Sequence, residues 1–536
     1  MISRFSNPSV MRHSFSNVPQ AQIQRSAFRR SHGHKTTLDQ SGYLYPVYVD
    51  EALPGDTFNL NVSAVARLAT PIKPIMDNLF MDFHFFAVPN RLLWDNWERF
   101  MGQQDNPGDS TDYQIPTVFS PTATGWEQGS LYDYFGVPVD VGDLEMSALY
   151  PRAYHLIWNE WFRDQNLQDS AYFFTGDTDG PLNYVLQKRG KRHDYFTSCL
   201  PWPQKQIDVP LPWNVEAPVS GLGVLTQAFA NDNVSVFESN EEAKTYDFAK
   251  IIGDGADFQV AVESSGGSAG AYPNVHVDLA AGSGTVEALR EAFQLQRMLE
   301  RDARGGTRYT EILQSHFRVV SPDSRLQRPE YLGGGSRPIT FSPVPQTAST
   351  DPAGPDASPQ GNLAATAYIQ TSGIGFTKSF VEHSIIIGLC SIRADITYQT
   401  GLNRMFNRRS KYDYYWPALA HLGEQAVLNK EIYAQGTAQD EDVFGYQERW
   451  AEYRYHPSLI TGKMRSSVAD SLDVWHLSQD FDELPQLNSD FIEENPPVDR
   501  IIAVPTEPHF IFDGYFNVTT TRPMPVNSIP GMIDHF

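Results

Sequence analysis

Residues 76–102 constrain the fold of this chain more than any other stretch, because they contain a strand that needs cover on both sides. Between residues 78 and 88, Leu79, Met81, Phe83, Phe85 and Ala87 alternate onto one face, and Phe80, Phe86 and Val88 onto the other, beside Asp82 and His84. A strand that is apolar on both faces is buried on both faces. We therefore predict a strand deep in a sheet or a sandwich.

The same stretch continues into a predicted helix. Pro89 cannot continue the hydrogen bonding of a strand, and Asn90 is a favourable N-cap. Apolar residues recur at helical spacing from 91 to 101, Asp95 and Arg99 are spaced for an i,i+4 ion pair, and Gly102 is a helix stop. We predict a helix over 91–101 that packs on the strand.

Composition favours a β-rich protein that works in a reducing cytoplasm. The 38 glycines and 37 prolines among 536 residues indicate many turns rather than long helices. Two cysteines, Cys199 and Cys390, cannot form a disulfide framework and are expected as free thiols. We expect neither a signal peptide near Met1 nor membrane insertion, because no apolar run is long enough.

Charge is distributed unevenly along the chain. The net charge is −23, which argues against a simple nucleic-acid binder. Residues 1–40 carry a net +5, which leaves −28 on the remainder. Their polar, Arg- and Ser-rich composition predicts a basic arm that is disordered or ordered only by a partner.

Strand and turn signals recur at both ends of the chain and suit an antiparallel sandwich of the jelly-roll kind. Strands are predicted within 41–90, around a turn at 54–56, and at 379–398 and 509–520; helices are predicted at 151–166 and 286–303. Residues 332–363 are predicted as a Gly- and Pro-rich loop.

The predicted organisation has four parts. They are the arm (1–40), a first part of the jelly roll with helical insertions (41–204), a variable surface insertion of short strands and loops (205–284), and a second part of the jelly roll with loops and a C-terminal tail (285–536).

Motifs of catalysis and metal binding are missing from the sequence. HExxH and CxxC do not occur, and His32 and His34 have no neighbouring ligand residues. The triple glycine 333–335 lacks the context of a phosphate loop and is predicted to be a flexible loop. We predict no catalytic residues, no metal and no cofactor. The acidic groups at 440–442 and 493–494 are interpreted as solvated faces.

Basic clusters are the candidate DNA contacts. Cations pair with phosphates, and neighbouring aromatic rings can stack on unpaired bases. The candidate residues are Arg25, Arg29, Arg30 and Lys35 in the arm and Arg404, Arg408, Arg409 and Lys411 before Tyr414-Tyr415-Trp416. The run 188–193 is a weaker candidate. The alternative for each cluster is a subunit interface or an ion-pair patch.

Several motifs together resemble one protein family. Residues 83–102 read FHFFAVPNRLLWDNWERFMG and 444–455 read FGYQERWAEYRY; FSNVP (15–19), LPGDTF (53–58) and PGMIDH (530–535) occur in register with them. These motifs resemble the major capsid proteins of the Microviridae, small icosahedral single-stranded DNA phages, and fit the gokushovirus branch best. The resemblance spans nearly the whole chain except about 205–284.

The resemblance implies a structural role in a virion. It implies a mainly β, eight-stranded antiparallel jelly roll with long loop insertions and a few helices. It also implies a T = 1 shell of sixty copies around circular single-stranded DNA, assembled in the cytoplasm of a bacterial host. Residues 205–284 would form the protrusion at the threefold axes and contact a host cell-surface receptor.

Two further expectations concern partners. Sixty arms would supply roughly +300, against about 1,600 phosphates in a genome encoding only this chain, so we expect a small basic DNA-binding packaging protein. Large side chains expected at interfaces or in packing are Trp94, Trp97, Phe100, Trp158, Trp161 and Trp450. The alternative function is a β-sandwich protein that binds or cleaves carbohydrate.

Overall fold

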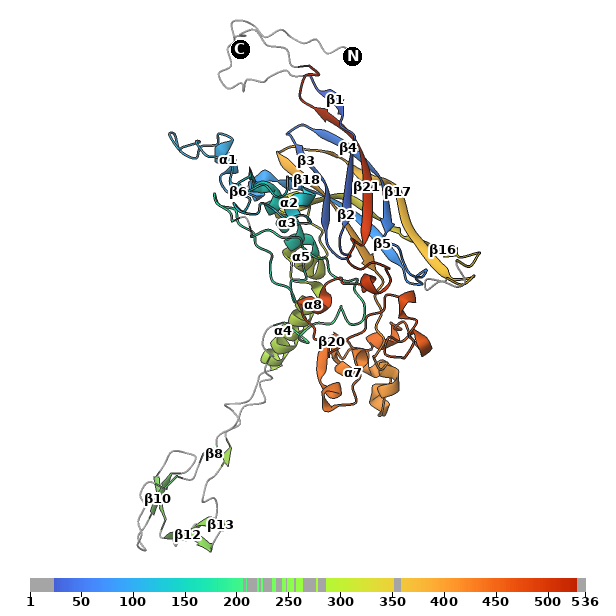
Figure 1. Ribbon diagram of the computed structural model, residues 1–536. Helices are drawn as coiled ribbons and strands as arrows, with labels where there is room; N and C mark the ends of the chain where they lie inside the picture. Colours follow the sequence, from blue (N-terminus) through green and yellow to red (C-terminus); the bar gives the residue numbers. More distant parts are fainter. Residues whose placement is uncertain are drawn as a thin grey trace, which may run out of the picture. The chain divides into compact units, whose positions relative to one another are not determined.

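The computed structural model describes residues 24–180, 182–205, 209, 286–350 and 358–527, together with the backbone of short strands between 219 and 277 (Figure 1). The chain divides into two compact units. One comprises Met1–Pro203 and Thr307–Phe536, and the other comprises Gln204–Gly306.

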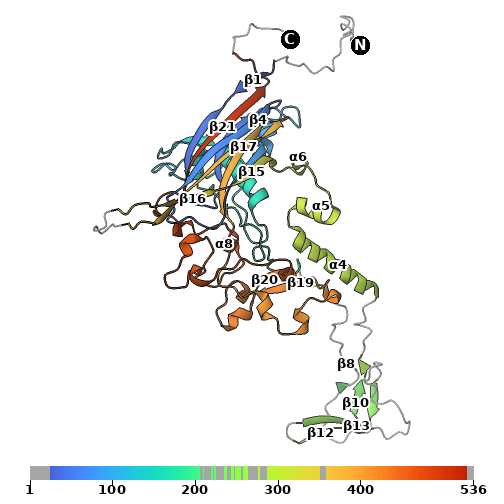
Figure 2. The same ribbon diagram turned by 90° about the vertical axis from the view of Figure 1, so that its right-hand side faces the viewer.

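A six-stranded antiparallel sheet forms one layer of the larger unit. Its strands are β1 (Ser26–Arg29), β2 (His32–Leu38), β4 (Thr57–Leu68), β16 (Thr340–Pro345), β17 (Leu363–Ser379) and β21 (Phe510–Arg522). The order is β1-β21-β4-β17-β16, with β2 also paired to β21, and Figure 2 shows β21, β4 and β17 side by side. The predicted strand at 509–520 is confirmed as β21.

A four-stranded sheet forms the second layer, in the order β15-β5-β18-β3. Its strands are β3 (Tyr45–Ala52), β5 (Leu79–Pro89), β15 (Glu330–Pro338) and β18 (Ser384–Ala394). The core lies between the sheets, where the ring centroids of Phe83 and Phe512 are 6.2 Å apart. The protein is therefore a mainly antiparallel β-sandwich.

The predicted strand at 78–88 is confirmed as β5, including the assignment of its faces. Leu79, Met81, Phe83, Phe85 and Ala87 belong to the core between the sheets. Phe86 and Val88 belong to a second apolar cluster on the other side of the four-stranded sheet. The strand is therefore covered on both faces, as its two apolar rows require.

The second cluster covers the outer face of the four-stranded sheet with helices and loops. It includes α2 (Leu131–Tyr134), α3 (Leu149–Ile157) and the π-helical turn η2 (Trp158–Phe162). The helix predicted at 151–166 is confirmed as α3 and η2, which end at Phe162. Figure 1 shows α2 and α3 beside β3 and β18, with β21 and β17 on the other side. The four-stranded sheet is thus buried on both faces, whereas the six-stranded sheet is not.

The helix predicted over 91–101 is wrong as a continuous element. The segment forms a 3-10 turn, η1 (Asn90–Leu92), and a single helical turn, α1 (Trp97–Phe100). Trp94 donates its indole N–H to Asp177 at 2.7 Å, and the backbone N–H of Asp95 donates to the Thr175 carbonyl. These tertiary hydrogen bonds interrupt the helix between its two turns. Arg99 pairs with Asp105 rather than with Asp95.

The predicted disorder of the arm is wrong for residues 26–38. They form β1 and β2, and both strands pair with β21. Residues 1–23 lie outside the described part of the chain. The short polar side chains of this segment suit a strand with one solvated face, a pattern that composition alone does not reveal.

The loop predicted at 332–363 is also wrong for most of its length, because residues 330–345 form β15 and β16 and β17 begins at Leu363. The triple glycine lies in β15 and pairs with β5. A Cβ atom on Gly334 would lie 2.2 Å from the Phe83 carbonyl oxygen, and one on Gly375 would lie 1.9 Å from that of Leu60. Glycine here permits close backbone approach rather than flexibility.

Two further groups of elements complete the described chain. The unit 204–306 contains α4 (Val286–Gly305), which confirms the predicted helix, and β8 (Val219–Ser220), β9 (Gly223–Val224), β10 (Val234–Phe237), β11 (Ala243–Tyr246), β12 (Phe248–Asp254), β13 (Asp257–Glu263) and β14 (His276–Val277). The predicted strand at 379–398 is confirmed as the shorter β18. The larger unit also contains β6 (Thr117–Phe119), β7 (Glu145–Ser147), α5 (Tyr309–Phe317), α6 (Asp323–Leu326), β19 (Glu424–Leu428), α7 (Asn429–Ile432), β20 (Val443–Glu448) and α8 (Ser489–Ile492).

Candidate interface sites

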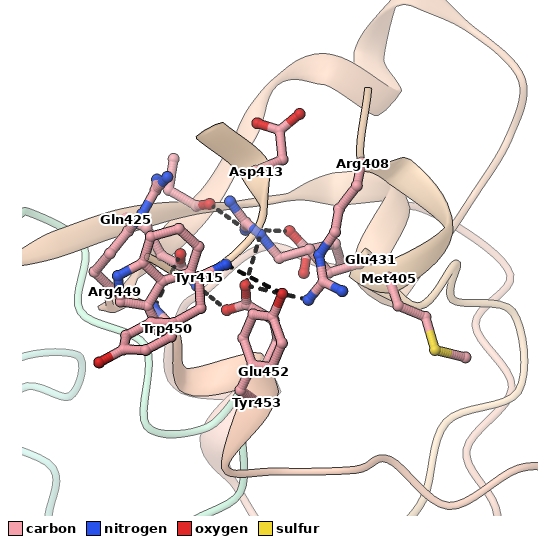
Figure 3. A network of polar contacts seen from close by, with 12 residues as sticks. Met405, Arg408, Asp413, Tyr415, Gln425, Glu431, Arg449, Trp450, Glu452 and Tyr453 are labelled. Atoms are coloured by element: carbon pink, nitrogen blue, oxygen red, sulfur yellow. Dashed lines mark hydrogen bonds and ion pairs between the residues drawn. The ribbon is translucent and has the colours of Figure 1, made fainter. Parts of the chain in front are cut away.

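The third basic cluster forms a compact site with residues that follow it in the chain. We call residues 402–416 the aromatic–arginine loop. It contains the 3-10 turns η4 (Arg404–Asn407) and η5 (Lys411–Asp413) and lies against β19 and the turn η8 (Ala451–Tyr453) (Figure 3). The Asn403 side chain accepts the Met405 backbone N–H, and the Asp413 carboxylate accepts those of Arg409 and Ser410. These hydrogen bonds fix the turns and lower the pKa of Asp413.

Two buried carboxylates anchor the loop. Arg404 donates to Glu431 at 2.8 Å and lies 3.9 Å from Glu452, and Arg408 lies 3.7 Å from Glu452. Glu431 also accepts the Tyr195 hydroxyl at 3.1 Å. Burial raises the pKa of Glu431, and the Arg404 guanidinium opposes that rise. Arg404 and Arg408 are therefore committed to internal ion pairs.

Arginine–aromatic stacking holds the rings of the site in place. The Arg408 guanidinium lies 4.3 Å from the Tyr453 ring centroid, and that of Arg449 lies 4.4 Å from the Trp450 ring. Trp450 is buried, adopts φ +70° and donates its indole N–H to the Leu419 carbonyl. The stacked rings give the site a fixed shape.

The outer surface of the site is aromatic and cationic. Arg409 and Lys411 are exposed. Between 47% and 70% of the side-chain surface is accessible for Phe406, Tyr412, Tyr414, Tyr415 and Trp416. A hollow of about 270 Å³ opens beside Arg409 and Lys430, and one of about 360 Å³ opens between Tyr195 and Leu459. Rigid aromatic rings among cations can anchor a protein partner or stack on unpaired bases.

The four basic residues of the arm occupy different environments. Arg29 and Lys35 are exposed on β1 and β2. Arg30 pairs with Asp50 and stacks on Phe58 at 5.7 Å. Arg25 donates to the Gly55 carbonyl oxygen and to the Thr57 hydroxyl. Lys35 lies 3.7 Å from Asp513, so Arg29 is the one of the four without a charged or hydrogen-bonding partner among the described residues.

The basic run 188–193 is an internal ion-pair patch rather than a free basic surface. Arg189 donates to Asp82 at 2.8 Å, and Arg192 donates to Asp395 at 2.8 Å. The Lys191 ammonium lies 4.3 Å from the Phe491 ring centroid, and burial lowers its pKa to about 8. Asp82 belongs to β5, and Asp395 directly follows β18, so the two ion pairs hold the segment against both strands.

The large aromatic side chains expected at interfaces or in packing are all buried or partly buried. Trp94, Trp158 and Trp450 are buried. Trp97, Phe100 and Trp161 are partly buried against the second cluster. The Trp161 indole donates to the Pro329 carbonyl at 3.0 Å, and its ring stacks under Arg328 at 4.2 Å. All six therefore contribute to packing within the subunit.

Reactive groups of an enzyme are not assembled in the described residues. Both cysteine thiols are buried, which raises their pKa values far above the ordinary range. Within those residues, no group of three or more His, Cys, Asp or Glu side chains could hold a metal ion. None of the helices in the described part is long and apolar enough to cross a membrane.

Reasoning from the sequence missed the partners of the aromatic–arginine loop. Glu431, Arg449, Glu452 and Tyr453 complete the site, and three of them lie inside the motif at 444–455. The motif was recognisable, but the pairing of its carboxylate with Arg404 and Arg408 depends on the tertiary fold.

Comparisons with known proteins agree on one family. The model of the family described as "Capsid protein (F protein)" matches residues 16–532. Capsid protein VP1 of Bdellovibrio phage phiMH2K is 46% identical over 542 residues, covering 98% of each chain. Capsid protein VP1 of Chlamydia phage 1 is 44% identical over 595 residues, again covering 98% of each. Capsid protein VP1 of Spiroplasma virus 4 is 36% identical over 563 residues, covering 99% of this chain and all of the relative.

Proposed function

Because this chain belongs to the capsid protein (F protein) family, whose members compared here are structural proteins of phage virions, we propose that sixty copies form a T = 1 icosahedral shell around single-stranded DNA. The resemblance to Microviridae capsid proteins is confirmed. The chain is a structural virion protein and not an enzyme, and this removes the carbohydrate-cleaving alternative.

The fold we propose for the shell domain is an eight-stranded jelly roll. Its support is a nested set of antiparallel pairs: β5 pairs with β15, β4 with β17, β3 with β18 and β2 with β21. A jelly roll is such a set of four nested pairs, wrapped so that successive pairs alternate between two sheets. In this description β1 and β16 are additional edge strands of the six-stranded sheet.

The observation that carries the proposed function is the family match over residues 16–532 together with this sandwich. A closed shell requires each subunit to bury surface against its neighbours. The exposed rings of the aromatic–arginine loop are suitable anchors for such contacts, because Trp, Tyr and Arg dominate interface energetics.

Electron microscopy and mass measurement of the expressed protein test the shell. Sixty subunits of 60.3 kDa would give a particle with about 3.6 MDa of protein and icosahedral symmetry. Monomers that do not assemble under any ionic condition, or particles with another copy number, would refute the proposal.

Two partners are part of the proposal. The net charge of −23 supports a separate small basic protein that neutralises the packaged DNA, since the cations of this chain are too few. Particles that hold DNA without a basic peptide, polyamine or excess metal would contradict this. We place assembly in the cytoplasm of the bacterial host.

Residues 205–284 are proposed as the receptor-binding protrusion at the threefold axes. The support is their glycine- and serine-rich composition and their place within a separate compact unit. Deletion of 210–280 should spare assembly and abolish attachment to host cells. Loss of assembly instead would identify the segment as an interface.

A further inference from the structure

A hollow of about 650 Å³ lies where the residues after β2 meet α2 and the segment 182–186. We call it the tyrosine pocket, because its aromatic lining consists of Tyr43, Tyr45, Trp126, Tyr132 and Tyr184. Its volume falls in the range of small-molecule sites. None of the basic clusters discussed above contributes a residue to the described lining, so the pocket is separate from the candidate interface sites.

Both charged side chains among the described residues of the lining are acidic. The Glu127 side chain is exposed and has no hydrogen bond or ion pair within the described part of the chain. The Asp39 carboxylate accepts the Thr37 hydroxyl at 2.9 Å and the Tyr134 hydroxyl at 3.3 Å. A carboxylate has about four acceptor positions, so Asp39 retains the capacity to accept further hydrogen bonds.

A lysine outside the lining does not neutralise the pocket. The Lys188 ammonium lies 5.3 Å from the Tyr43 ring centroid, but it is also 3.8 Å from the Glu493 carboxylate, which balances its charge. The two carboxylates of the lining therefore have no cationic partner among the described residues.

The aromatic walls of the pocket are fixed by contacts within the subunit. The rings of Trp126 and Tyr132 stack with centroids 4.4 Å apart and planes at 14°. The Tyr45 hydroxyl donates to the Gln40 carbonyl at 2.8 Å and accepts the Gln40 backbone N–H at 2.9 Å. Fixed ring faces attract ammonium groups without paying for reorganisation, and nearby carboxylates add to that attraction.

We propose that the tyrosine pocket binds a linear aliphatic polyamine. Its ammonium groups pair with Asp39 and Glu127, and its methylene chain lies along the rings. A flexible chain with several ammonium groups can reach two separate carboxylates. Leu182 and Val185 line the pocket with 77% and 55% of their surface exposed, and contact with methylene groups would remove part of that apolar surface from water. The inference goes beyond the structural role and does not depend on it.

Other classes of ligand fit the pocket less well. An anion would meet two carboxylates and no cation among the described lining residues. A metal ion lacks ligands, because no group of three or more His, Cys, Asp or Glu side chains occurs in the described residues. A neutral apolar molecule would remove both carboxylates from water without giving them a partner.

Equilibrium dialysis of unassembled full-length subunits against radiolabelled spermidine tests the inference. E127Q removes one carboxylate, and its matched control is E98Q at an exposed position outside the lining. Q40K places a tethered ammonium in the pocket, and its matched control is Q103K. The four substituted side chains are exposed, so the variants should fold, and thermal melting of each variant checks this.

We expect saturable binding of about one spermidine per subunit, with an affinity that falls as sodium chloride is raised from about 50 to 200 mM. E127Q should weaken binding about threefold to fivefold, since an exposed ion pair contributes up to about 1 kcal/mol. Q40K should weaken it at least as much, because its ammonium repels the ligand and competes for the same carboxylates. Both controls should bind as the wild type does.

Binding that does not saturate, or that is equal in E127Q and E98Q, would overturn the inference, because spermidine would then be a diffuse counterion. The same dialysis on assembled particles gives a second check. Particles that bind no spermidine, although free subunits do, would show that a side chain of a neighbouring chain fills the pocket instead. Assembly is observed separately by electron microscopy, so either failure leaves the proposed function standing.

Discussion

Asp82 is the outward-facing charge of β5, and its replacement should cost far more stability than replacement of an exposed aspartate in the same sandwich. Its side chain is 3% exposed and lies 2.8 Å from Arg189 and 2.7 Å from Arg393. The variant D82N keeps the shape and removes the charge. It leaves two largely buried guanidinium groups without their carboxylate.

The magnitude follows from the burial of this cluster. Breaking a buried ion pair by neutralising one partner costs about 3–5 kcal/mol. The Arg189 and Arg393 side chains retain 13% and 17% exposure, which places the expected loss near the lower end, at about 3 kcal/mol. The second oxygen of Asp82 has no hydrogen-bond partner among the described residues, so an amide NH2 placed there would find no acceptor.

The control is D513N, the same change in the exposed pair with Lys35. Exposed pairs contribute about 0–1 kcal/mol, so the free energy of unfolding should fall by less than 1 kcal/mol. Urea unfolding of unassembled subunits at pH 7, followed by tryptophan fluorescence, measures both variants. If D82N and D513N lose the same free energy, the reasoning that burial decides the strength of these pairs is refuted.

Three further outcomes are expected. Burial raises the pKa of Glu494 to about 7. As pH rises from about 5 to 7, the carboxyl group loses its proton in the unfolded chain before it does in the folded one, so the stability of the subunit should fall. The melting temperature of E494Q should not show this fall with pH, and an unchanged fall would contradict the assignment. G375A should destabilise the sandwich by about 2 kcal/mol or more, because the new Cβ would lie 1.9 Å from the Leu60 carbonyl oxygen. G33A, whose new Cβ would have its nearest neighbour at 3.8 Å, should change the stability by no more than about 0.5 kcal/mol. Equal melting temperatures of the two variants would show that the strands can separate freely. R404M should leave the buried Glu431 without its cation and Glu452 with Arg408 alone, and so loosen the aromatic–arginine loop. Hydrogen exchange of residues 402–416 would detect this as faster exchange, and unchanged exchange rates would show that the Arg404 ion pairs do not hold the loop.

Sequence patterns predicted those elements whose side chains carry a strong apolar period. β5 and β18 are apolar on both faces, and the structure buries them on both. β17 was missed because its first inward positions, Ala365 and Ala367, are small and its outward positions include many Thr, Gln and Ser residues. A strand with so little apolar contrast shows no clear period until its partners are known.

Glycine was the least reliable guide to flexibility. The triple glycine of β15 suggested a loop because glycine is common in turns, yet here it allows two backbones to approach closely. The backbone distance that requires glycine is a property of the tertiary fold and cannot be read from one strand.

The sequence identified the basic clusters, but it did not show which of their cations are already paired with carboxylates inside the subunit. The chain is rich enough in carboxylates to neutralise Arg404, Arg408 and the run at 188–193 internally. Sequence spacing identifies cations, whereas only the fold identifies which of them remain free.

The nested strand pairing has a consequence for synthesis. β21 is the final described strand, and it lies between β1 and β2 on one side and β4 on the other. β1 and β2 have no other partner in the sheet, so a nascent chain cannot complete its six-stranded sheet until almost its full length has left the ribosome. A prematurely terminated chain would expose the core at the middle of a sheet rather than at its edge. Only complete translation products can therefore offer a finished surface to neighbouring subunits.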